Sequence, residues 1–153
     1  MRISQYAYFS LSSETVTAAA ITGKLGIEPD KILVRGARDA ARVIPRVHDW
    51  RVRVRGDNRP INDMLAELIQ RLDPVVGTIA TVVREMPVQA RLQVVRKFDD
   101  PDGVEDEGTT PQMAARGWEK VEGQHHLLGW RLDRQTLDFL QRTSAELDVD
   151  EYG

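Results

Sequence analysis

Period-two alternation of apolar and polar residues predicts most of the strands in this chain. The clearest case is residues 50–55, Trp-Arg-Val-Arg-Val-Arg, where three apolar side chains would lie on one face and three arginines on the other. Residues 90–96 alternate in the same way, and the aromatic-rich residues 6–11 predict a first strand. Shorter runs predict three further strands, at 31–35, 126–132 and 146–152.

A stripe of apolar residues at helical spacing predicts the longest helix, over residues 60–72. Its members fall at i, i+3, i+4, i+7, i+8 and i+11: Ile61, Met64, Leu65, Leu68, Ile69 and Leu72. The dipeptide Asp73-Pro74 interrupts this helix, because proline is disfavoured inside a helix and favoured at its first position. We therefore expect a second helix over residues 74–85, with Asp73 as its N-cap.

Capping residues predict a helix near each end of the chain. Ser12 and Ser13 would cap the first of these and Gly26 would end it in a left-handed conformation. Asp133 would cap the last helix, with Leu137 and Leu140 leading its inner face. The order of elements, β-α-β-β-α-α-β-β-α-β, predicts an α+β fold. We expect a mainly antiparallel mixed sheet of about five or six strands, with the helices packed chiefly on one face.

Composition indicates one globular domain over residues 1–153. Hydrophobic residues make up 41% of the chain and charged residues 29%, enough to build and solubilise a core. Cysteine is absent, which excludes disulfides and thiolate chemistry and favours a reducing compartment. No signal peptide and no apolar run of about 18 residues is evident, so we expect a cytoplasmic protein with no membrane partner.

The net charge of −3 conceals a strong segregation of charge along the chain. Seven arginines lie between positions 35 and 55, whereas residues 99–108 contain six acids and no basic residue. Residues 99–123 are polar and rich in glycine and proline, and we expect a mobile acidic loop insertion there. Within it, Trp118 is a candidate interface anchor, since tryptophan is enriched at binding hot spots; packing back on the domain edge is the alternative.

Three segments, taken in order, resemble a known bacterial family. They are Tyr8-Phe9-Ser10-Leu11 with the later Leu25-Gly26-Ile27-Glu28-Pro29, then His48-Asp49-Trp50 after Gly36, and finally residues 145–152, Ala-Glu-Leu-Asp-Val-Asp-Glu-Tyr. In this order they are similar to the family catalogued as domain of unknown function 4279, across nearly the whole chain. The resemblance implies a small bacterial α+β domain and brings no activity with it.

Asp148 and Asp150 are the candidate acidic face, because they share one side of the last predicted strand. Paired carboxylates can hold a cation or divide acid and base roles, which would suit a metal-dependent hydrolase or a small-molecule binder. The alternative is structural: Arg51, Arg53 and Arg55 could pair with these acids if the two strands were neighbours.

The sequence contains no recognisable motif for metal binding by histidine or for a nucleophilic serine. The three histidines lack metal-ligand spacing, and the serines lack the context of a nucleophile elbow. We therefore assign no catalytic residue, no metal and no cofactor. A sequence pI near 5.6 argues against nucleic acid as a partner of the arginines.

We expect a non-enzymatic protein-binding module of the immunity or regulatory type. Its candidate partner-binding residues are Arg51, Arg53, Arg55 and Trp118. A homodimer formed by edge-strand pairing is a further expectation.

Overall fold

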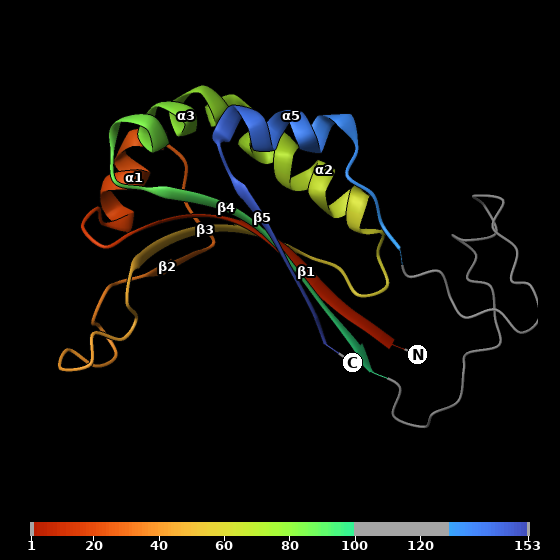
Figure 1. Ribbon diagram of the computed structural model, residues 1–153, viewed down its shortest axis with the longest axis horizontal. Helices are drawn as coiled ribbons and strands as arrows, with labels where there is room; N and C mark the ends of the chain where they lie inside the picture. The colour runs from red at the N-terminus through yellow and green to blue at the C-terminus, as the bar shows by residue number, and fades with distance from the viewer. Residues whose placement is uncertain (1, 100–128, 153) are drawn as a thin grey trace, which may run out of the picture.

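A computed structural model describes residues 2–99 and 129–152, in which five strands form one sheet (Figure 1). The sheet order is β2-β3-β1-β4-β5, and every neighbouring pair is antiparallel except β4 and β5, which run parallel. The strands are β1 (Arg2–Ser13), β2 (Lys31–Leu33), β3 (His48–Arg55), β4 (Gln89–Asp99) and β5 (Glu146–Tyr152). The predicted α+β class and mixed, mainly antiparallel sheet are confirmed.

The helices of the described residues all lie on one side of this sheet, as Figure 1 shows. They are α1 (Ala18–Leu25), α2 (Ile61–Leu72), α3 (Val76–Glu85) and α5 (Arg134–Thr143), with a 3-10 turn, η1 (Asp73–Val75), between α2 and α3. In the part of the chain that the structure describes, no helix combines the length and the apolar character that a membrane crossing requires.

Alternation along the strands sends apolar side chains to the helices and polar ones to the opposite face. On β3, Trp50, Val52 and Val54 are buried, as the sequence predicts. On β1 the buried apolar set is Ala7, Phe9 and Leu11. These side chains meet the apolar stripe of α2, whose six predicted members are all buried, and form one core cluster.

The helix boundaries differ from prediction in two places. Asp73 is not the N-cap of the second helix: it is the C-cap of α2, with a helical backbone, and the chain passes through η1 into α3, whose N-cap is Val75. Ser13 does not begin α1, because its hydroxyl accepts hydrogen bonds from the backbone of Thr15 and Val16 in a turn, and Thr17 is the N-cap. Gly26 ends α1 at a φ of 70°, as predicted.

The last third of the chain corrects two further predictions. The strand expected at 126–132 lies partly outside the described residues, and its described part, 129–132, is not a strand. On α5, Asp133 is the N-cap as predicted. Of the two leucines expected on its inner face, Leu140 packs partly buried against the core, but Leu137 is 51% exposed. The buried side chain is Phe139, whose ring meets that of Phe9 edge-to-face at 5.4 Å between centroids.

Phe139 should therefore carry most of the docking energy of α5 on the sheet. We expect Phe139→Ala to lower the free energy of unfolding by about 3–5 kcal/mol, because it removes a fully buried ring and leaves a cavity. Leu137→Ala is the matched control on the same helix and should change stability by no more than about 0.5 kcal/mol. Urea denaturation of both variants tests this. Equal losses would show that the inner face of α5 is assigned wrongly.

Candidate functional site

The face of the sheet opposite the helices gathers most of the polar side chains singled out by the sequence. We call it the helix-free face. Cross-strand register places side chains from β3, β1, β4 and β5 on it in three consecutive rows. The rows are Arg51, Ser10, Arg91 and Glu146; Arg53, Tyr8, Gln93 and Asp148; and Arg55, Tyr6, Val95 and Asp150.

Two tyrosines occupy the middle of this face and orient the arginines beside them. The rings of Tyr6 and Tyr8 stack with their centroids 6.3 Å apart. The guanidinium of Arg51 lies 4.4 Å from the centroid of Tyr8, and that of Arg55 lies 5.9 Å from the centroid of Tyr6. Cation–π attraction at such distances is worth about 0.5–1 kcal/mol at exposed sites. The ring of Tyr8 therefore helps to hold the half-buried Arg51 over the sheet, whereas Arg55 lies over Tyr6 and stays exposed.

Arg51 has a carboxylate partner, whereas the other two arginines of β3 do not. Its guanidinium binds the carboxylate of Asp49, which is 2% exposed. Burial raises the pKa of Asp49 above its usual value, even though Arg51 and more distant cations oppose the shift. Within the described residues, neither Arg53 nor Arg55 forms an ion pair with a carboxylate, and the guanidinium of Arg55 lies over the ring of Tyr6.

The acids of β5 lie at the far side of the same face and contact β4. Asp150 accepts a hydrogen bond of 2.9 Å from the amide of Gln93, and Asp148 lies 3.8 Å from the guanidinium of Arg91. The proposed ladder between the arginines of β3 and these acids does not form within one chain, because β1 and β4 separate β3 from β5. Among the described residues, no group of three or more His, Asp or Glu side chains is arranged to hold a metal ion.

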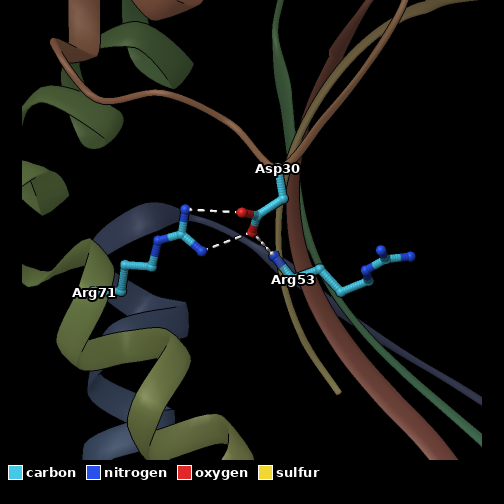
Figure 2. Close-up of polar contacts among 3 residues, drawn as sticks. All are labelled: Asp30, Arg53 and Arg71. Atoms are coloured by element: carbon cyan, nitrogen blue, oxygen red, sulfur yellow. Dashed lines mark hydrogen bonds and ion pairs between the residues drawn. The ribbon is translucent and has the colours of Figure 1, made fainter.

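A carboxylate from the turn before β2 fixes the position of Arg53, as Figure 2 shows. Asp30 accepts a hydrogen bond of 2.7 Å from the backbone N–H of Arg53, and two more, of 2.7 and 3.0 Å, from the guanidinium of Arg71 on α2. The side chain of Arg53 points away from both partners. Asp30 thus ties the edge of β3 to the helix layer while the guanidinium of Arg53 stays available on the other face.

The electrostatics of Asp30 agree with this bracing role. Burial alone would raise the pKa of the Asp30 carboxyl, but the hydrogen bonds from Arg71 and from the Arg53 backbone, together with both positive charges, lower it below its usual value. The ionised form is therefore the one that the folded chain stabilises.

The sequence singled out the arginines and acids of this face but not its tyrosines. Tyr6 and Tyr8 were expected as core or sheet-face aromatics and not as part of a site, although their spacing of two residues already places them on one side of the strand. Asp49 was likewise missed, since nothing local in the sequence marks it as buried. Trp118 and the expected loop at 99–123 lie outside the described residues, except for Asp99 at the end of β4.

Asp30→Asn should destabilise the fold by about 1 kcal/mol at pH 7, a modest value because both partners are part-exposed. Since the folded pKa is lowered, the stabilisation is fully present above the unfolded pKa of about 3.9 and disappears as pH falls through the folded value. The difference in the free energy of unfolding between wild type and Asp30→Asn, measured by urea denaturation, should therefore shrink below about pH 4.

Asp73→Asn provides the control for this measurement. Asp73 lies 3.9 Å from Arg142 in an exposed pair, so its loss should matter little at any pH. If the difference in the free energy of unfolding between wild type and Asp30→Asn stayed constant with pH, the role assigned to the ionised Asp30 would be contradicted.

The comparisons with known proteins bear on the family of the chain alone. No curated protein and no solved structure matches it. The family model described as a domain of unknown function (DUF4279) matches residues 3–153, which is essentially the whole chain and includes every strand that builds the helix-free face. The resemblance noted in the sequence is thereby confirmed, and the chain belongs to the DUF4279 family.

Proposed function

We propose that the protein is a non-enzymatic protein-binding module of the bacterial cytosol, of the immunity or regulatory type, and that its helix-free face is the binding surface. One observation carries this proposal: stacked tyrosines lie together with two arginines that form no ion pair among the described residues, on the side of the sheet that no described helix covers. Tyrosine and arginine are the residues most enriched at the centres of protein interfaces.

The chemistry of the face favours protein recognition over nucleic-acid binding. A nucleic-acid platform needs free aromatic rings for bases and a positive surface for phosphates. Here guanidinium groups already lie over both tyrosine rings. The acids of β5 lie on the same face and would repel a phosphate backbone. A surface with both signs of charge around a central aromatic pair suits a protein partner that carries matching charges.

Site-specific photocrosslinking can test which surface binds. We expect a p-benzoylphenylalanine placed at Ser4, an exposed position on β1 that shares the face with Tyr6, to form an adduct with another polypeptide in a lysate of the source organism. The double substitution Arg53→Ala and Arg55→Ala should abolish that adduct, because it removes the two cations that lack a carboxylate partner. Mass spectrometry would identify the crosslinked chain.

The same photocrosslinker at Leu137 is the control for position, since Leu137 is exposed on the helix layer. It should give no adduct that depends on Arg53 and Arg55. The proposal fails if position 4 captures no polypeptide, or if both positions capture the same ones regardless of the arginines.

A further inference from the structure

The three rows of the helix-free face share an order of charge that runs across the whole sheet. Each row begins with an arginine on β3 and ends with a carboxylate on β5: Arg51 and Glu146, Arg53 and Asp148, Arg55 and Asp150. Between them each row crosses β1 and β4. One side of the face is therefore basic, the opposite side is acidic, and their charged positions match row by row.

Such a face is complementary to a copy of itself. Consider a two-fold axis that lies between two stacked sheets, parallel to the strands and over the boundary of β1 and β4. Rotation about it exchanges β3 with β5 and β1 with β4, and it leaves every row at its own level. A two-fold interface of this kind uses the same patch on both subunits. Face-to-face sheets also pack with their strands nearly aligned, about 10 Å apart.

We infer that the partner of the helix-free face is a second copy of this chain, in a two-fold, face-to-face dimer. In this dimer Arg53 meets Asp148 of the second copy and Arg55 meets its Asp150, and the same pairs recur by symmetry. The inference rests on the proposed function, that this face is the binding surface, and it names the partner.

The charges within one chain are consistent with this arrangement. Among the described residues, Arg53 and Arg55 form no ion pair, and in this dimer the second copy offers a carboxylate to each. The ion pair between Asp148 and Arg91 is long, at 3.8 Å, and half-exposed. Asp150 has a neutral partner, Gln93. Both acids thus have room for a stronger cationic partner. The two-fold axis also places each tyrosine opposite β4 of the second copy. Tyr8 then lies near Gln93 of that copy, and Tyr6 lies near its Val95.

Charge reversal separates this dimer from every other assembly. We expect the purified wild-type chain to show twice the mass of one chain by size exclusion with light scattering. One variant carries Arg53→Glu and Arg55→Glu, and another carries Asp148→Arg and Asp150→Arg. Each should weaken dimerisation by about a hundredfold or more, because like charges then face each other in both halves of the interface.

The decisive sample is an equimolar mixture of the two variants. In a mixed dimer the new glutamates of one chain face the new arginines of the other, and the remaining wild-type pairs are intact. The mixture should therefore recover a dimer that neither variant forms alone. Recovery cannot result from misfolded chains, and circular dichroism of each variant checks its fold separately.

The control for total charge is Arg84→Glu with Arg134→Glu, two exposed positions on the helix layer, which should leave the dimer unchanged. A wild-type chain that stays monomeric up to its solubility limit would overturn the inference, as would a mixture that stays monomeric or reversed variants that still dimerise. If the chain is monomeric while position 4 still crosslinks to a different protein through Arg53 and Arg55, the binding surface stands and only the identity of the partner is wrong.

Discussion

Successive residues of a strand point to opposite faces of a sheet, and in this protein the described helices cover only one of those faces. Burying Trp50 and Val52 against the helices therefore places Arg51 and Arg53 on the other side. The same holds for β1, where the burial of Ala7 and Phe9 brings Tyr6 and Tyr8 to the uncovered face. The core and the candidate binding surface are thus two consequences of one register, and a slip by one residue would destroy both.

The register of β3 is held from outside the sheet as well as from within it. β2 pairs with β3 only at residues 49–51, so the backbone of Arg53 lies beyond the end of β2. Asp30 satisfies that N–H and binds Arg71 of α2 through the same carboxylate. Asp30 thereby pairs a β3 donor that β2 leaves without a partner and joins this end of the strand to the helix layer.

Local sequence patterns predicted the helices and strands of this fold well, but they did not predict which of these elements contact one another. Trp50–Arg55 was assigned to a strand with the correct sidedness, and the stripe from Ile61 to Leu72 to the correct helix, because period-two and helical spacing report burial directly. Phe139 was missed as the anchor of α5 because Leu137 and Leu140 form an apolar i, i+3 pair on another side of the helix, and the partner ring of Phe9 decides which side faces the sheet.

The order of the strands in the sheet could not be predicted from the sequence, for a similar reason. Arg53 and Asp148 were considered as direct neighbours, yet two strands separate them, since nothing local states that β4 inserts beside β1. The burial of Asp49 and the long-range bond from Asp30 to Arg71 are likewise products of tertiary contact. For the candidate site, the sequence therefore provided the residue types and their sidedness, and the fold provided the rows that make the face self-complementary.

The absence of cysteine allows a direct measurement of how two copies meet. A single Ser4→Cys substitution places one spin label on the helix-free face of each chain, and Leu137→Cys places one on the helix layer. If the faces stack, double electron–electron resonance should give a label separation within about 25 Å at position 4 and a clearly longer one at position 137. A separation at position 137 shorter than that at position 4, or no dipolar coupling at position 4, would contradict the face-to-face dimer.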